Sequence, residues 1–149
     1  MPELYHFEDF AAGQVFVSHE HAMGQEEMIA FARAFDPQPM HTDEAVAMEL
    51  FGGIIASGWH TAALTMRLLV DGAMPKVAGG ALGLGVEKMS WPQPVRPGDV
   101  LRATITVLGT RPSRSRPDRG IVSLHTRTCN QAGETVLDHT SAILVPRRA

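Results

Sequence analysis

The chain has 149 residues, of which 44% are hydrophobic and only 19% charged, and its formal net charge at pH 7 is −3. A length of this order corresponds to one domain, so we expect residues 1–149 to form a single folded unit without a separate cofactor-binding module. The charged fraction lies below the roughly 25% of an average soluble domain, which excludes a disordered chain and indicates that part of the surface is covered in an oligomer.

The same composition argues against several kinds of partner and site. A slightly acidic chain without a basic tract is not expected to bind nucleic acid. The longest uncharged stretch, residues 50–66, is too short and too often broken by glycine to cross a bilayer, and the first residues do not resemble a secretory signal. Because Cys129 is the only cysteine, an intrachain disulfide and a cysteine-based zinc site are excluded. We therefore expect a soluble, cytoplasmic protein that does not bind membranes.

The first part of the chain is predicted to begin with one strand and one helix. The strand is expected at residues 14–21. The helix is expected at Gln25–Phe35, because its apolar side chains recur on one helical face and two glutamates occupy its first turn. Residues 36–41 then contain two prolines, which cannot continue the helix, and this predicts a stiff loop rather than a flexible one.

Two more helices are predicted before the middle of the chain. Thr42 is expected to cap a short helix at residues 43–48. A longer helix is expected to start at Ser57 and to end at about Asp71. Its apolar residues lie on nearly every face, which is typical of a helix enclosed by other structure.

The second half of the chain is predicted to form strands. Four segments rich in β-branched residues alternate with turn clusters of proline and glycine; they are residues 81–91, 100–108, 120–129 and 134–145. With the N-terminal strand they make an antiparallel sheet of about five strands. The sequence therefore predicts an α+β fold in which this sheet curls around the long helix.

Among the seven histidines, His41 is the one with a potential chemical partner nearby in sequence. Asp36 lies five residues before it, across the proline-stiffened loop. A carboxylate and an imidazole on one rigid loop can both bind a single water molecule and withdraw its proton. The competing interpretation is structural, with Asp36 capping the loop and His41 packing under the second helix. His60, in the first turn of the long helix, is interpreted as a packing residue.

A second candidate site is the start of the long helix. The N–H groups of Gly58 and Trp59 are expected to be unpaired and to point outward along the helix dipole. Such donors stabilise a carbonyl oxygen that gains negative charge, and glycine at position 58 lets a ligand approach the backbone. Ser57 is expected to be the helix N-cap, a structural role that is compatible with the first.

A basic loop is the third feature with possible chemistry. Four arginines crowd one predicted hairpin: Arg111, Arg114, Arg116 and Arg119. Arginine side chains bind phosphates well, but a solvated loop is the interpretation we favour for this segment.

Two motifs carry a resemblance to a known family. FDPQPMHTD at residues 35–43 and FGGIIASGWH at residues 51–60 resemble the MaoC-like dehydratases, also called hydratase-2 enzymes, of the hotdog fold. The resemblance implies a five-stranded antiparallel sheet around a central helix and a homodimer, or a higher homo-oligomer, that joins two sheets. It also implies reversible hydration of an enoyl-CoA-type thioester to an (R)-3-hydroxyacyl thioester. In this family Asp36 and His41 correspond to the catalytic pair, and Gly58 to the glycine whose amide holds the thioester oxygen.

The chain departs from the family pattern at two places. Gln38 stands where the usual D-x-N-P-x-H loop has asparagine, and I-I-A-S-G replaces P-I-x-H-G. Both changes keep the Asp36–His41 pair and the Gly58 amide but reshape the pocket. The identity of the acyl group of the substrate is therefore not predicted. Neither a metal nor an organic cofactor is expected, because one well-placed water supplies the atoms that are added and coenzyme A is part of the substrate.

Two other functions fit the same fold. A hotdog acyl-CoA thioesterase also combines a carboxylate with a helix-terminal amide, so the fold alone does not decide between them. A non-catalytic acyl-CoA-binding subunit would keep the pocket without activity. The presence of both Asp36 and His41 favours hydration, since together they hold water without an acyl-enzyme nucleophile.

Overall fold

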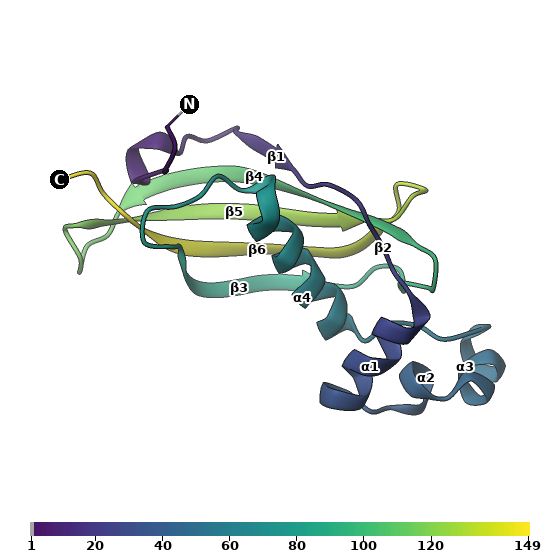
Figure 1. Ribbon diagram of the computed structural model, residues 1–149. Coiled ribbons are helices and arrows are strands. Elements are labelled where there is room, and N and C mark those ends of the chain that lie inside the picture. The colour runs from purple at the N-terminus through teal and green to yellow at the C-terminus, as the bar shows by residue number, and fades with distance from the viewer. Residues whose placement is uncertain (1) are drawn as a thin grey trace.

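The computed structural model describes residues 2–149, in which a sheet is crossed on one face by a helix while the remaining helices gather beyond one end (Figure 1). Within these residues the strands are β1 (Val15–Val17), β2 (His21–Ala22), β3 (Leu82–Ser90), β4 (Val100–Pro112), β5 (Arg119–Cys129) and β6 (Thr135–Pro146). The helices are α1 (Gln25–Phe35), α2 (Pro39–Thr42), α3 (Glu44–Phe51) and α4 (Gly58–Leu68), with a 3-10 turn at Phe7–Asp9 and a π-type turn at Leu69–Ala73.

The sheet is antiparallel and follows the order β1-β4-β5-β6-β3, with β2 also pairing to β4. Its inner face carries the core. Alternate residues of β4, which include Leu101, Ile105 and Val107, are buried beneath α4 together with Leu64 and Leu68 of that helix. This arrangement follows from the period of two in a strand, which turns every second side chain to the same face. The predicted α+β fold with a sheet on a helix is thus confirmed.

The N-terminal strand differs from the prediction, because residues 14–21 form two short strands rather than one. At the break, Ser18 Oγ accepts a hydrogen bond from Ala103 N at 2.9 Å and donates one to His19 O at 2.7 Å. A side-chain hydroxyl thus takes the place of a backbone carbonyl in the ladder, which interrupts regular pairing. The sheet therefore has six strand segments among the described residues, where about five were predicted.

Two predictions about the segment after α1 are wrong. Part of the expected loop is helical, because Pro39 occupies the first position of α2, where a helix needs no backbone N–H. The cap of α3 is Asp43 rather than Thr42. Asp43 Oδ1 accepts from Ala45 N at 3.0 Å and from Val46 N at 3.2 Å, whereas the Thr42 hydroxyl donates to a backbone carbonyl.

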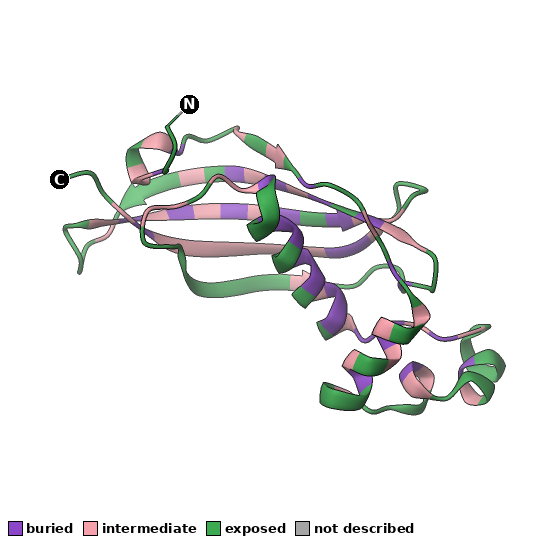
Figure 2. Cartoon of the chain, in the orientation of Figure 1, coloured by how far each residue is buried: buried purple, intermediate pink, exposed green. Residues whose placement is uncertain are grey.

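Helix α4 is covered on one side only, so the prediction of an enclosed helix is wrong for the single chain. Its sheet-facing residues are buried, but Trp59 and Met66 are 61% and 59% exposed, and Val70 in the π-type turn that follows is 70% exposed. Figure 2 shows the same division, with exposed segments on α4 and along most of the edge strand β3. No helix of the described residues is long and apolar enough to cross a membrane.

Candidate active site

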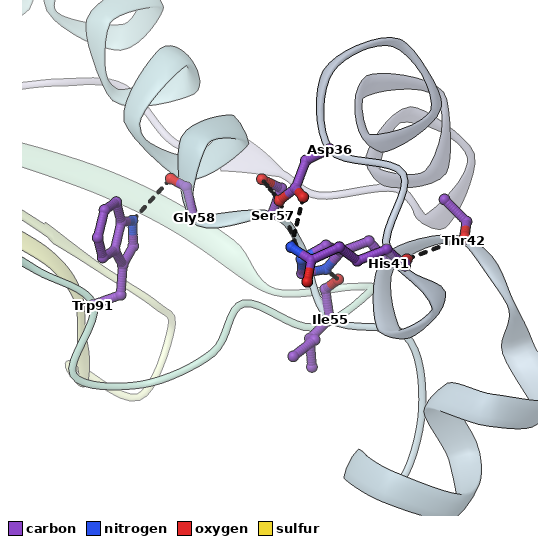
Figure 3. Close-up of polar contacts among 8 residues, drawn as sticks. Asp36, His41, Thr42, Ile55, Ser57, Gly58 and Trp91 are labelled. Carbon is purple, nitrogen blue, oxygen red and sulfur yellow. Dashed lines mark hydrogen bonds and ion pairs between the residues drawn. The ribbon is translucent and has the colours of Figure 1, made fainter.

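Three residues from three separate segments meet at the N-terminal end of α4 (Figure 3). Asp36 directly follows α1, His41 lies in α2, and Ser57 directly precedes α4. The short helix α2 turns His41 back toward Asp36, so that His41 Nε2 lies 3.4 Å from Asp36 Oδ2. Ser57 Oγ donates a hydrogen bond of 2.7 Å to the same carboxylate oxygen. The structure thus brings together the predicted pair.

Both oxygens of the Asp36 carboxylate are held by hydrogen bonds. Gln38 Nε2 donates to Oδ1 at 2.7 Å, and Ser57 Oγ donates to Oδ2. These two donors, helped by the nearby His41 ring, lower the pKa of Asp36 below its ordinary value in spite of partial burial. Asp36 is therefore a carboxylate at neutral pH, and Gln38, the residue that departs from the family pattern, is one of its two anchors.

The hydrogen bond at His41 Nδ1 fixes which nitrogen of the ring carries the proton. His41 Nδ1 lies 2.7 Å from Ile55 O, and because a carbonyl oxygen only accepts, Nδ1 must carry the proton. In the neutral ring Nε2 then presents a lone pair toward Asp36 Oδ2. Two acceptors 3.4 Å apart cannot bond to one another, but they can both accept from one water molecule. The side chain of Asp36 is 17% exposed and that of His41 only 6%, so Asp36 is the more accessible member of the pair.

Free backbone donors lie next to this pair. Among residues 2–149, neither Gly58 N nor Trp59 N donates to a protein acceptor, as expected for the first two positions of a helix. Ser57 is the N-cap residue of α4, as predicted, but its side chain does not cap the helix, because its hydroxyl is bonded to Asp36. The first helical hydrogen bonds of α4 are accepted by the backbone carbonyl of Ser57, from His60 N at 2.9 Å and Thr61 N at 3.2 Å.

Trp91 is a neighbour of this site that sequence reasoning missed. Its Nε1 donates to Gly58 O at 2.8 Å, and its ring meets the exposed side chain of Trp59 edge-on, with centroids 5.4 Å apart. A Cβ atom at position 58 would lie 2.7 Å from Trp91 Cε2. The space beside the Gly58 Cα is therefore filled by an indole ring and is not free for a ligand, in contrast to the prediction. No sequence signal links the two positions, which are 33 residues apart.

Comparison with known proteins gives these residues a family context. Residues 9–128 match the MaoC like domain family. The chain belongs to this family. Its membership confirms the family and the hotdog fold predicted from the two motifs, and with them an enzyme of the hydro-lyase class.

Three related proteins show how far the MaoC-like resemblance extends. The (R)-specific enoyl-CoA hydratase of Rhodospirillum rubrum is 28% identical over 152 residues, covering 97% of this chain and 94% of that protein. The crystal structure of a MaoC-like dehydratase from Rhodospirillum rubrum has 51% identity and a TM-score of 0.91, over 97% of this chain and 99% of that one. The R-hydratase PhaJ1 of Pseudomonas aeruginosa has 28% identity and a TM-score of 0.78, over 96% of this chain and 86% of that one.

The other candidates of this MaoC-like chain lie outside the site. His60 stacks on Phe31 with ring centroids 4.7 Å apart, as its interpretation as a packing residue requires. The arginine-rich hairpin joins β4 to β5 at the end of the sheet opposite the start of α4 (Figure 1). There Arg116 and Arg119 form ion pairs with Asp118. Among residues 2–149, no group of three or more His, Cys, Asp or Glu side chains is arranged to hold a metal ion.

Proposed function

We propose that this MaoC-like chain catalyses the reversible hydration of an enoyl-CoA-type thioester to an (R)-3-hydroxyacyl thioester. The observation that carries the proposal is the approach of Asp36 Oδ2 to His41 Nε2, 3.4 Å apart, beside the free amides of Gly58 and Trp59. The relatives named hydratases support the reaction class, since the chain covers nearly the whole length of the Rhodospirillum rubrum hydratase.

The mechanism follows from the hydrogen-bonding capacity of each group. A water molecule donates one hydrogen to Asp36 Oδ2 and the other to His41 Nε2, which turns its oxygen lone pair toward C3 of the enoyl group. As the C3–O bond forms, His41 takes the proton of this water and negative charge moves to the thioester oxygen. The amides at the start of α4, on Gly58 and Trp59, stabilise that charge. His41 then returns the proton to C2, so that water is added across the double bond.

The same scheme defines what the reaction requires. The water supplies both the hydroxyl group and the proton, so neither a metal nor an organic cofactor takes part. Ser57 and Gln38 keep the carboxylate in its reactive orientation and ionised. A coenzyme A thioester as substrate also fits the cytoplasmic location expected from the sequence.

A pH titration tests the role of the anchored carboxylate. Ser57→Ala and Gln38→Leu each remove one donor to Asp36, and because these donors lower its pKa, their loss raises it. The mechanism also needs His41 Nε2 unprotonated, so the acidic limb of a rate profile does not report Asp36 alone. The NMR signal of the Asp36 carboxyl carbon reports this group directly, and we expect its titration to move to higher pH in both variants.

The matched control for these variants is Thr42→Val. The Thr42 hydroxyl donates to the backbone oxygen of Gln38 at 3.1 Å and does not touch the carboxylate, so its loss is expected to leave the Asp36 titration in place. An unmoved titration in both Ser57→Ala and Gln38→Leu would show that these donors do not lower the pKa of Asp36.

A two-channel assay separates hydration from the two competing functions. Purified protein is offered crotonyl-CoA and branched enoyl-CoA esters, and the conjugated enoyl absorbance is followed separately from the release of free coenzyme A thiol. Hydration removes the absorbance without releasing thiol. Thiol release would favour the thioesterase, and binding without either change would favour an acyl-CoA-binding subunit.

The proposed assembly is a homodimer, or a higher homo-oligomer built from it, in which β3 pairs with its copy. β3 is an edge of the sheet, and Leu82, Leu84 and Val86 on it are at least half exposed. An unpaired edge with exposed apolar side chains is a surface that folded proteins normally cover. The exposed Trp59 of α4, whose ring meets that of Trp91 directly after β3, extends this apolar surface, and Met66 of the same helix is exposed as well.

Sedimentation tests the proposed dimer. At micromolar concentration we expect twice the mass of one chain, and Val86→Glu is expected to shift the protein toward monomer by burying a charge at the interface. The matched control is Val15→Glu on the opposite edge strand β1, where the replaced side chain is equally exposed at 55%. A stable, active monomer, or dissociation by Val15→Glu instead, would contradict pairing through β3.

A further inference from the structure

Trp91 contacts the first turn of α4 in two ways. It directly follows β3, and its Nε1 donates a hydrogen bond of 2.8 Å to Gly58 O. In addition, its ring atoms Cε2 and Nε1 would lie 2.7 and 2.8 Å from a Cβ at position 58, closer than real contacts of this kind. Figure 3 shows the indole against the start of α4, on the other side of Gly58 from Asp36 and His41.

The hydrogen bond from Trp91 acts on one of the free amides. The carbonyl of Gly58 and the N–H of Trp59 belong to the same peptide group, which is planar, so fixing the oxygen fixes the direction of the N–H. A donor on the carbonyl oxygen also polarises the peptide group and makes its N–H a stronger donor. This N–H has no protein acceptor among residues 2–149. Trp91 thus orients and strengthens the Trp59 amide from behind.

We propose that Trp91 is a positioning residue for the oxyanion site, acting through the Gly58–Trp59 peptide, and that its ring is the reason why position 58 requires glycine. This inference rests on the proposed hydration reaction. It assigns the Trp59 amide an equal part with that of Gly58 in holding the thioester oxygen. It also explains the glycine by packing between α4 and the end of β3 rather than by access of the substrate.

The first experiment removes the donor and keeps the ring. Trp91→Phe is expected to lower kcat for enoyl-CoA hydration by about three- to tenfold, the range for one lost hydrogen bond, while KM changes by less than about twofold. The split arises because the thioester oxygen carries its negative charge in the transition state only. The control is Arg127→Met, which removes side-chain donors to the backbone oxygen of Gly133, in the turn after β5, and to Thr135 Oγ1, and which is expected to leave kcat unchanged. An unchanged kcat in folded Trp91→Phe would overturn the positioning role.

The second experiment tests the origin of the glycine. Gly58→Ala is expected to lower both kcat and Tm, because its Cβ displaces the indole ring or the helix start. In the double variant Gly58→Ala/Trp91→Ala the space is free, so kcat and Tm are expected to return to those of Trp91→Ala alone. If the decreases in kcat and Tm of the two single variants simply add in the double variant, position 58 needs glycine for another reason and this part of the proposal is wrong.

A measurement that does not depend on catalysis, the NMR shift of the Trp59 amide, tests the role of Trp91 independently of the proposed function. In Trp91→Phe the backbone amide proton of Trp59 is expected to shift upfield in the NMR spectrum, since a less polarised peptide group deshields its proton less. If wild-type protein hydrates no enoyl thioester, the proposed function fails, but the Tm cycle and the amide shift still decide the role of Trp91. An unmoved Trp59 amide would contradict it whatever the activity.

Discussion

Asp36→Asn and His41→Gln are each expected to lower kcat for enoyl-CoA hydration by about 10²- to 10⁴-fold, the usual contribution of a general acid–base group. Asparagine at position 36 presents an N–H to one of its neighbours and so loses an acceptor that Gln38, Ser57 and water use. Glutamine at position 41 can still donate to Ile55 O, but its amide oxygen is too weak a base to take the proton of the water. Steady-state rates and thermal unfolding of each variant are the measurements.

The chain contains a matched control for this pair. His125 Nε2 and Asp138 Oδ1 lie 3.1 Å apart on β5 and β6, where both side chains are about one third exposed. His125→Gln and Asp138→Asn make the same chemical changes in a second Asp–His pair, and we expect both to leave kcat unchanged. Since Asp36 and His41 act on one water molecule, the double variant should lose little more than either single variant. Near wild-type turnover in folded Asp36→Asn or His41→Gln would remove the pair from the mechanism.

Gly58→Val is expected to lower kcat by about 10²- to 10³-fold, which corresponds to the roughly 2.7–4 kcal/mol lost with one oxyanion donor in a known enzyme. The branched side chain cannot fit against Trp91, so the first turn of α4 moves and its amides leave the thioester oxygen. The comparison of kcat and KM with those of wild type measures the effect, and loss of kcat is expected to exceed any change in KM.

The matched control for this substitution is Gly109→Val in β4, where an added Cβ meets no atom within 4 Å. Valine suits a strand, so this variant is expected to keep both kcat and Tm. Ser57→Ala, immediately before Gly58, is expected to raise the pKa of Asp36 and to reduce kcat far less than Gly58→Val. If Ser57→Ala stopped turnover while Gly58→Val spared it, the serine hydroxyl would replace the amides in the mechanism.

Features set by neighbouring residues could be predicted from the sequence. The bounds of α1 agree with the prediction because its apolar period and acidic first turn are local, and Glu27 accepts from Gly24 N at its start. The strands of the second half follow from alternation and turn clusters in the same way. The Asp36–His41 pair also belongs to this class, since five residues and two prolines leave the chain few ways to separate the two side chains.

Contacts between segments far apart in the sequence decided the surroundings of Asp36, His41 and Gly58. Ser57 lies 21 residues from Asp36, Ile55 O lies 14 residues from the His41 ring that it orients, and Trp91 lies 33 residues from Gly58. The serine illustrates the reason: its local pattern favours an N-cap, but a carboxylate brought close by packing of α1 against α4 is a stronger acceptor for its hydroxyl. The sequence by itself thus determined α1, the strands of the second half and the closeness of Asp36 to His41. Only the tertiary structure decided which nitrogen of His41 carries the proton, how Asp36 is anchored and why Trp91 leaves no room for a side chain at position 58. These features depend on which surfaces pack together, and the local sequence pattern contains no information about that packing.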